Sequence, residues 1–240
     1  MVRPMPKHRK TLLGLRQAGI ALALGLILVA PLAWSQSLEG QPLPVRGSNL
    51  AVVEIVEVGD FECPHCAKAQ AALKQVLEAY PQQVRLVFLH QPLPFHDQAL
   101  QAALATRVAQ KSGKFWEMAD TFFTEQGDLS TIHTRGVAMR HGITLEALNE
   151  GLKSPETQAF IEANKQVGMA LGVTGTPAFF INGTMIRGAK PFASFKAIID
   201  IEIAMAGKAP MTPEAAAAYR QSRTRTNLSL IHISEPTRPY

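Results

Sequence analysis

Two cysteines separated by two residues constrain this chain more than any other feature. They are its only cysteines, and they lie in the segment Phe61-Glu62-Cys63-Pro64-His65-Cys66. An apolar, β-branched run over residues 51–58 precedes the pair, and a helix-like run over 67–80 follows it. This arrangement suits thiol–disulfide exchange, because the free N–H groups and the dipole of a helix N-terminus favour a thiolate over a thiol.

We assign different roles to the two cysteines. Cys63, at the start of the helix, is expected to attack, and Cys66, one turn further along, to resolve the mixed disulfide. Pro64 and His65 lie between them, and the His65 imidazole can donate a hydrogen bond or positive charge to the Cys63 thiolate. Thiols in such motifs have pKa values between ~3.5 and ~7.5 instead of about 8.5. Strong stabilisation of the thiolate predicts an oxidising disulfide.

Two other uses of the cysteines are less consistent with the sequence. A structural disulfide across two residues would gain little loop-closure entropy. A zinc site usually needs four ligands, but the chain has no second Cys-x-x-Cys, and its histidines at 65, 90 and 96 are scattered. We therefore predict no metal, and no cofactor beyond the redox-active Cys63–Cys66 disulfide.

The first 35 residues predict an export signal. Residues 1–16 contain five basic side chains and no acidic one, an apolar run extends from Ala18 to Trp34, and Ala33 and Ser35 are spaced as in a cleavage site. A retained N-terminal membrane anchor is the alternative, although 17 apolar residues are short for a span of about 20. Both interpretations place the remainder in the periplasm or another extracytoplasmic compartment, where a disulfide persists.

The formal charge of +5 comes from this leader. It holds five of the 24 Lys and Arg residues and none of the 19 Asp and Glu residues, so the exported part is formally neutral. A basic face for a nucleic acid is not indicated, and we predict no nucleic-acid partner.

The hydrophobic pattern predicts one α/β domain over residues 51–206. The expected elements are a linker over 36–50, strands over 51–58 and 84–90, a helix over 63–80, a helical block over about 97–152, a helix from Pro155, strands over 178–181 and 185–187 around Asn182-Gly183, and a helix over 192–206. This order is the thioredoxin topology with an all-helical insertion between the second and third core strands.

The pattern decays after Gly207. Residues 208–221 are rich in alanine and could extend a helix, whereas residues from about 228 resemble translated sequencing-adapter read-through. We expect residues 207–240 to lie outside the fold and assign them no function.

Glu57 lies six residues before Cys63, between two valines. A carboxylate inside an apolar strand is costly to bury unless it exchanges protons with a partner, for which we suggest Cys66. Glu54 and Glu57 have opposite parity in the strand, so at most one faces the layer beneath the cysteines. We favour Glu57. The alternatives are that it faces solvent or that Glu54 holds the inner position.

Thr176-Pro177 opens the predicted third core strand. A proline is tolerated at the first position of a strand, and cis bonds concentrate in such tight approaches. A cis bond would leave the Thr176 backbone free to pair with an incoming peptide, so we predict that Thr176 and Pro177 bind substrate. A trans bond is nevertheless the expectation for X-Pro in general.

His90 and His96 flank the loop after the second core strand. One interpretation places them on the active-site face, but we favour ordinary surface histidines. Aromatic residues at helical spacing are expected to form the core of the insertion: Phe115, Trp116, Phe122 and Phe123.

These residues resemble those of the DsbA-like thiol:disulfide oxidoreductases. The likeness covers about residues 45–206 and is carried by Cys63-Pro64-His65-Cys66 after Asp60-Phe61, by the segment from Gly175 to Gly183 around Thr176-Pro177, and by the segment from Pro92 to Trp116. It implies a thioredoxin fold with an all-helical insert, a cis bond before Pro177, Cys63 as nucleophile and a buried acid at Glu57. It also implies an envelope location and a membrane thiol-redox partner.

The function predicted from this resemblance is an exported enzyme that donates its Cys63–Cys66 disulfide to unfolded or reduced exported proteins. The best-studied oxidants have Val before the cis proline, whereas Thr176 also occurs in relatives of the isomerase and reductase type. A disulfide reductase or isomerase is therefore one alternative. The other is a non-catalytic, chaperone-like module that binds unfolded chains beside Pro177.

Overall fold

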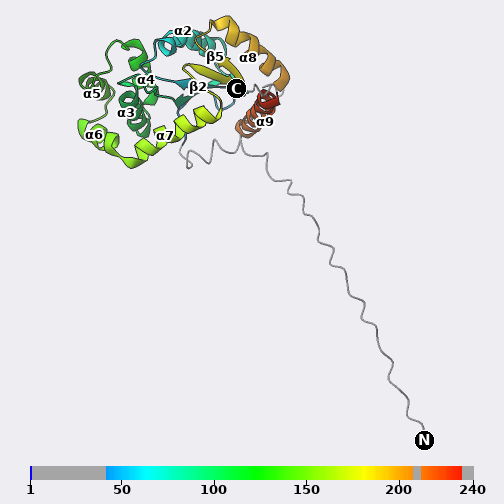
Figure 1. Ribbon diagram of the computed structural model, residues 1–240. Coiled ribbons are helices and arrows are strands. Elements are labelled where there is room, and N and C mark those ends of the chain that lie inside the picture. Colours follow the sequence, from blue (N-terminus) through cyan, green and yellow to red (C-terminus); the bar gives the residue numbers. More distant parts are fainter. Residues whose placement is uncertain (2–41, 208–211, 234–240) are drawn as a thin grey trace, which may run out of the picture.

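The computed structural model describes residues 1, 42–207 and 212–233. A mixed sheet lies at the centre, helices cover both of its faces, and a block of helices extends from one end (Figure 1). Apart from Met1, the predicted export signal lies outside the described residues. In the ranges that the structure describes, no helix is long and apolar enough to cross a lipid bilayer.

The strands are β1 (Val45–Gly47), β2 (Val53–Gly59), β3 (Val84–His90), β4 (Ala178–Ile181) and β5 (Thr184–Arg187). Their order across the sheet is β1-β3-β2-β4-β5. The neighbours β2 and β3 are parallel and the other pairs are antiparallel. Asn182 and Gly183 connect β4 to β5 with φ values of 43° and 89°, as a tight two-residue hairpin turn requires.

Strand β1 corrects the prediction of a linker over 36–50. Its residue Val45 lies opposite Val87 of β3, so part of that segment belongs to the sheet. An edge strand of three residues is too short to show the alternation by which strands are recognised. Residues 36–41 of the predicted linker lie outside the described ranges.

The helices are α2 (Pro64–Ala79), α3 (Ala99–Lys111), α4 (Phe115–Thr124), α5 (Thr131–Arg140), α6 (Leu145–Lys153), α7 (Pro155–Ala170), α8 (Phe192–Ala206) and α9 (Pro213–Ile233). Prolines at the first helical position begin α2 and α7, since the missing N–H has no partner to lose there. The side chains of Ser130 and Thr144 accept backbone N–H bonds and cap α5 and α6.

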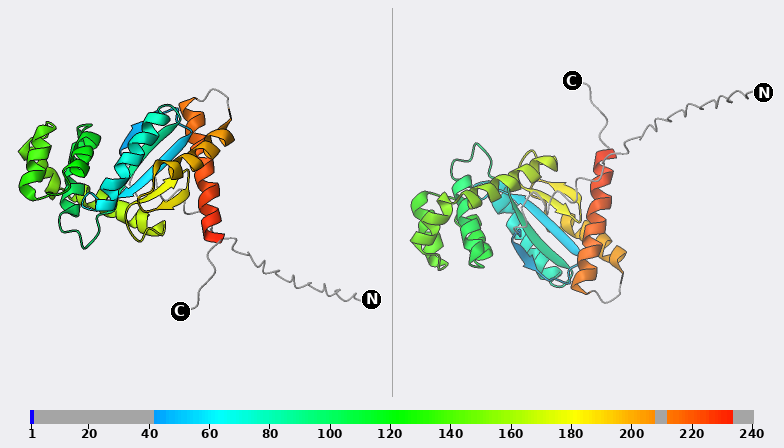
Figure 2. Two further views of the ribbon diagram at one scale, coloured as in Figure 1. Left: turned by 90° about the horizontal axis from the view of Figure 1, so that it is seen from above. Right: turned by 90° about the horizontal axis from the view of Figure 1, so that it is seen from below.

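The two faces of the sheet carry separate apolar cores. Helices α2 and α8 pack on the face that presents Val53, Ile55 and Phe179, and α7 packs on the face that presents Val56 and Phe180 (Figure 2). The thioredoxin fold predicted from the order of elements is therefore confirmed.

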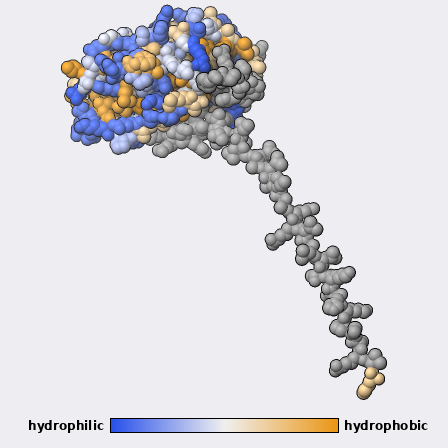
Figure 3. Space-filling view, viewed as in Figure 1, coloured by the Kyte–Doolittle hydropathy of each residue, from blue (hydrophilic) through white to orange (hydrophobic). Residues whose placement is uncertain are grey.

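Helices α3 to α6 form the predicted insertion between β3 and β4. Its core contains Phe115, Phe122 and Phe123 as expected, and Trp116 is partly buried against it. Phe61, Cys66 and Phe88 belong to the same cluster, so the insertion packs directly on the cysteine motif. In the view of Figure 3, apolar patches interrupt a mainly hydrophilic surface over this part of the molecule.

Helix α9 differs from the expectation for residues 207–240. Arg223 donates to both carboxylate oxygens of Glu202 in α8, at 2.8 and 3.0 Å, and Asn227 donates to the carbonyl of Asn182 at 2.8 Å. Residues 213–227 are thus attached to the fold, because their polar side chains meet buried partners that are distant in sequence. The side chains of 228–233 and all of 234–240 lie outside the description.

Candidate active site

The N-terminus of α2 presents both cysteines to the loops around it. Cys63 is the N-cap residue, and its carbonyl accepts hydrogen bonds from the N–H groups of Cys66 at 2.9 Å and Ala67 at 3.3 Å. Both side chains are thiols, with relative exposures of 4% for Cys63 and 0% for Cys66. The predicted attacker is therefore more covered than the exposed thiolate that exchange chemistry suggests, because the helical insertion packs over the motif.

The surroundings of Cys63 favour its anion. The hydrogen bond from the Cys66 thiol is the largest cause that lowers the pKa of Cys63, from 9.0 to about 5. Burial opposes this change, while Thr176 and the backbone N–H groups of Cys66 and His65 reinforce it. A thiol with this pKa is almost wholly a thiolate at neutral pH, as a nucleophile for exchange must be.

Cys66 has the opposite character. Burial is the largest cause that raises its pKa, and the hydrogen bond that it donates to Cys63 and the charge of Glu57 add to the effect. One cysteine is therefore poised as an anion and its partner as a protonated donor, which matches the predicted division between attacking and resolving thiol.

Glu57 lies in β2, on the face covered by α2, with none of its surface exposed. Its Oε1 accepts a 2.8 Å hydrogen bond from Gln70 Nε2, whereas Oε2 has no partner among the described residues. Burial raises the pKa of Glu57 from 4.5 to about 8, although the Gln70 hydrogen bond lowers it. The carboxyl group is thus neutral at pH 7 and close to a second titrating group, Cys66.

Glu54 faces the other side of the sheet. Arg85 Nε donates to its Oε2 at 2.7 Å, so this acid belongs to a surface ion pair rather than to the cysteine layer. The alternatives of a solvent-facing Glu57 and an inner Glu54 are both excluded.

The peptide bond between Thr176 and Pro177 is cis, as the family resemblance implies and general frequencies do not. It precedes β4, and it places the Thr176 carbonyl oxygen 3.4 Å from Cys63 Sγ. The residue predicted to contact substrate therefore lies directly beside the nucleophile.

His65 is exposed on the first turn of α2. Its backbone N–H contributes to the low pKa of Cys63. Among the hydrogen bonds of the described residues, none joins its imidazole to Cys63. The role predicted for the imidazole stays a prediction.

His90 corrects the expectation of a surface histidine. Its ring is fully buried, 5.2 Å from Phe88 and 5.7 Å from Phe115 between ring centroids, and neither ring nitrogen has a hydrogen-bond partner among the described residues. Burial and the charge of Arg107 lower the pKa of His90 from 6.5 to about 3. Aromatic residues of the insertion and of β3 bury the His90 ring. The sequence around His90 does not predict these contacts.

His96 also differs from that expectation. Its side chain is 17% exposed, and its Nδ1 lies 2.8 Å from Oδ2 of the fully buried Asp60. Neither the burial of Asp60 nor this pairing was predicted, since Asp60 entered the sequence argument only as part of a motif.

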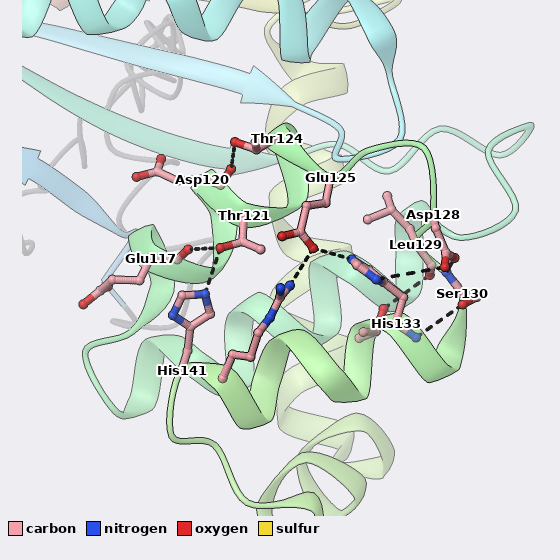
Figure 4. A network of polar contacts seen from close by, with 12 residues as sticks. Glu117, Asp120, Thr121, Thr124, Glu125, Asp128, Leu129, Ser130, His133 and His141 are labelled. Carbon is pink, nitrogen blue, oxygen red and sulfur yellow. Dashed lines mark hydrogen bonds and ion pairs between the residues drawn. The ribbon is translucent and has the colours of Figure 1, made fainter.

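Gln126, in the loop between α4 and α5, is a further residue that the sequence argument missed. Its Nε2 donates to the carbonyl oxygens of Phe61 at 2.6 Å and Cys63 at 2.9 Å. Figure 4 shows the polar network around this loop, in which His133 points toward the carboxylate of Glu125. His133 Nε2 lies 3.1 Å from that carboxylate, and the Arg140 guanidinium lies 2.5 Å from it. The insertion thus fixes the backbone of the cysteine turn from outside.

The position of Gln70 beside Cys66, by contrast, could have been predicted from the sequence. It follows Cys66 by four residues in a helix, and such residues share a face. Its Nε2 reaches the Cys66 carbonyl at 3.3 Å as well as Glu57. Within the described ranges, no group of three or more His, Cys, Asp or Glu side chains could hold a metal ion.

Comparisons with known proteins agree with this geometry. A family profile described as Thioredoxin matches residues 40–201. The curated relative "Na(+)/H(+) antiporter NhaA 1" of Salinispora arenicola is 35% identical over 156 residues, which are 65% of this chain and 24% of that protein. An "Na(+)/H(+) antiporter NhaA 3" of Salinispora tropica is 36% identical over 145 residues, 22% of its length. The chain spans about a quarter of the curated relatives it matches.

Solved structures match over a larger share of their own length. A thioredoxin-like oxidoreductase from Silicibacter pomeroyi DSS-3 is 26% identical with a TM-score of 0.64, covering 70% of this chain and 97% of that one. BdbD from Bacillus subtilis is 23% identical with a TM-score of 0.62, covering 68% of this chain and 93% of that one, a likeness of fold. The chain belongs to the thioredoxin family, and its fold is that of the DsbA-like thiol–disulfide oxidoreductases.

Proposed function

We propose that the protein is an exported thiol:disulfide oxidoreductase that donates its Cys63–Cys66 disulfide to thiols of folding proteins. The observation that carries the proposal is the contrast between the two cysteines: the pKa of Cys63 is lowered to about 5, while that of Cys66 is raised. Stabilisation of the Cys63 thiolate stabilises the reduced enzyme, and a stabilised reduced form makes the corresponding disulfide an oxidant.

In the proposed reaction a substrate thiolate attacks Cys63 Sγ. The Cys63–Cys66 bond breaks, its electron pair leaves with Cys66 Sγ, and a mixed disulfide joins the substrate to Cys63. A second substrate thiolate then attacks the substrate sulfur, and Cys63 leaves as a thiolate. The substrate is oxidised to a disulfide and the enzyme is reduced by two electrons.

The buried acid is proposed to supply a proton in this sequence. Cys66 departs as an anion in surroundings that disfavour a thiolate, so it must be protonated. Glu57 is protonated below a pH of about 8 and lies close enough to interact with the Cys66 charge. Proton transfer from Glu57 to Cys66, followed by reprotonation of Glu57 from water, completes the step.

The location and the partners are also proposals. The leader-like residues 1–35 support export. One structural neighbour is described as a periplasmic thioredoxin-like protein from Salmonella enterica. In that compartment the substrates would be unfolded or reduced exported proteins, and a membrane thiol-redox partner would restore the disulfide. Sodium–proton exchange is not carried over from the antiporter relatives, because the match covers 24% of such a protein.

The reduction potential of the Cys63–Cys66 pair tests the direction of electron flow. Equilibration with glutathione redox buffers should give a value near the oxidising end of the range for this fold, about −120 mV, rather than the about −270 mV of a reductant. A value near the latter would favour the reductase or isomerase alternative. Full activity of Cys63→Ala on reduced, unfolded substrates would instead leave only the binding-module alternative.

A further inference from the structure

The sulfur of Cys66 receives a hydrogen bond that the proposed reaction does not yet use. The backbone N–H of Asp60 donates to Cys66 Sγ at 3.5 Å in a fully buried setting. Cys66 must carry negative charge whenever the Cys63–Cys66 bond breaks or re-forms. Since water does not reach this sulfur, the N–H of Asp60 is placed to stabilise that charge.

The side chain of Asp60 fixes the position of this N–H. Its Oδ1 accepts from the Glu62 N–H at 2.7 Å, and its Oδ2 accepts from the Leu93 N–H at 2.8 Å and lies 2.8 Å from His96 Nδ1. A carboxylate accepts and does not donate, so the His96 nitrogen that faces it carries the hydrogen. Three contacts from two separate segments thereby hold one buried residue.

His96 ties the loop after β3 to the cysteine turn. The next contact along this loop repeats the connection, since the Gln98 N–H donates to Glu62 Oε2 at 2.7 Å. The ring of Phe95 lies against the His96 imidazole, 4.7 Å away between centroids, and the His96 side chain is 17% exposed. The imidazole is therefore a fixed donor and not a freely rotating surface group.

We infer that Asp60 is a positioning residue for the resolving cysteine and that His96, through its Nδ1–H, holds Asp60 in place. The inference rests on the proposed exchange reaction. According to this inference, His96 and Asp60 increase the rate of the steps in which Cys66 leaves or attacks as a thiolate. Neither side chain touches a reacting atom, because the contact with sulfur is made by the backbone of Asp60.

Four variants test this assignment. His96→Leu and Asp60→Ala remove the contacts. His96→Asn retains an N–H donor at nearly the position of Nδ1, and Asp97→Asn removes an exposed carboxylate from the same loop as a control. Two properties are measured for each: the rate at which oxidised enzyme oxidises a dithiol peptide, and the rate at which Cys66 expels glutathione from a mixed disulfide with Cys63 and so re-forms the Cys63–Cys66 disulfide.

His96→Leu and Asp60→Ala should oxidise the peptide about tenfold more slowly, a loss of about 1.4 kcal/mol of transition-state stabilisation, and should slow the expulsion of glutathione by a similar factor. His96→Asn and Asp97→Asn should stay within about twofold of the unaltered enzyme. Alkylation of Cys63 in the reduced enzyme should be unchanged in the His96 variants, which separates a local effect from a general loss of structure.

The outcomes are distinguishable. Unaltered rates of peptide oxidation and of glutathione expulsion in His96→Leu would overturn the inference, and so would equal damage in His96→Leu and His96→Asn. If Asp60→Ala does not fold, the two His96 variants decide the matter. If the unaltered protein oxidises no peptide, the proposed function fails, while the expulsion of glutathione by Cys66 still tests the positioning role independently.

Discussion

The side-chain amide of Gln70 lies 2.8 Å from the buried carboxyl oxygen of Glu57, so the helix that carries the resolving cysteine and the strand beneath it share a hydrogen bond. This bond lowers the pKa of Glu57, but burial raises it more, to about 8. The balance keeps the acid neutral at the pH where thiol exchange takes place.

Glu57→Gln should remove a loss of stability that accompanies rising pH. Because the pKa of Glu57 is raised from 4.5 to about 8, the folded state binds more protons than the unfolded state in that interval. The contribution of Glu57 to the free energy of unfolding therefore falls as the pH rises from about 4.5 to about 8, by a few kcal/mol. The low pKa of Cys63 acts in the opposite sense in the reduced protein, so the quantity compared is the difference between Glu57→Gln and the unaltered protein. Urea titrations of reduced protein at several pH values measure the slope. Gln70→Ala is the companion variant. Loss of the Gln70 hydrogen bond should raise the Glu57 pKa and so extend the pH range over which stability falls to above pH 8. Identical slopes with and without Glu57 would contradict the assignment.

Alkylation of reduced enzyme by iodoacetamide should follow the Cys63 thiolate. The rate is expected to be half-maximal near pH 5 and to decline below it, because the thiolate is lost as the pH falls through the pKa. In Cys66→Ala the midpoint should move to higher pH, since the Cys66 thiol is the largest cause of the low pKa. A midpoint above pH 8 in the unaltered protein would refute the thiolate at Cys63.

Replacement of His90 by Phe should stabilise the protein in acid. Unfolding releases a histidine that binds a proton below about pH 6.5, whereas the buried ring has a pKa of about 3. Stability is therefore lost as the pH falls from about 6.5 toward 3. His90→Phe should be more stable than the unaltered protein by about 2 kcal/mol near pH 4.5, with the advantage shrinking above pH 7. Thermal unfolding at both pH values tests this, and an advantage independent of pH would argue against it.

Arg223→Ala should destabilise the protein if α9 belongs to the fold. The change removes both Arg223 contacts and leaves the buried carboxylate of Glu202 with the neutral amides of Asn182 and Asn227. We expect the free energy of unfolding to fall by about 2–3 kcal/mol. This is at the low end for a buried ion pair, because the Arg223 side chain is 20% exposed. Arg225→Ala, on the exposed side of the same helix, is the matched control with an expected change below about 0.5 kcal/mol. Equal urea midpoints for both variants would show that α9 does not contribute.

Much of this fold was accessible from local pattern. The β-branched run of β3 and the helix α8 have the predicted limits, and Asn182-Gly183 forms the predicted turn, because these signals act over a few neighbouring residues. β1 has only three residues, too few for any period. The attachment of α9 depends on Arg223 meeting Glu202, a contact that no local propensity encodes.

The residues of the site also fall into those that the sequence predicted and those that it did not. Cys63, Cys66, Glu57 and Pro177 were found because spacing, parity and family resemblance all act along the chain. Asp60, His90 and Gln126 were missed because their roles depend on what the β3–α3 loop and the insertion bring to them. Gln126 contacts the Cys63 carbonyl from 63 positions away, and glutamines in loops carry no signal of such contacts.

The slight exposure of Cys63, 4%, has a consequence for the choice of substrate. A sulfur covered on most sides by the Thr176 carbonyl, the helical insertion and α2 can be approached along few directions. In the proposed exchange with folding proteins, the substrate thiol would have to reach Cys63 along those few directions. A flexible chain would do so more readily than a rigid surface.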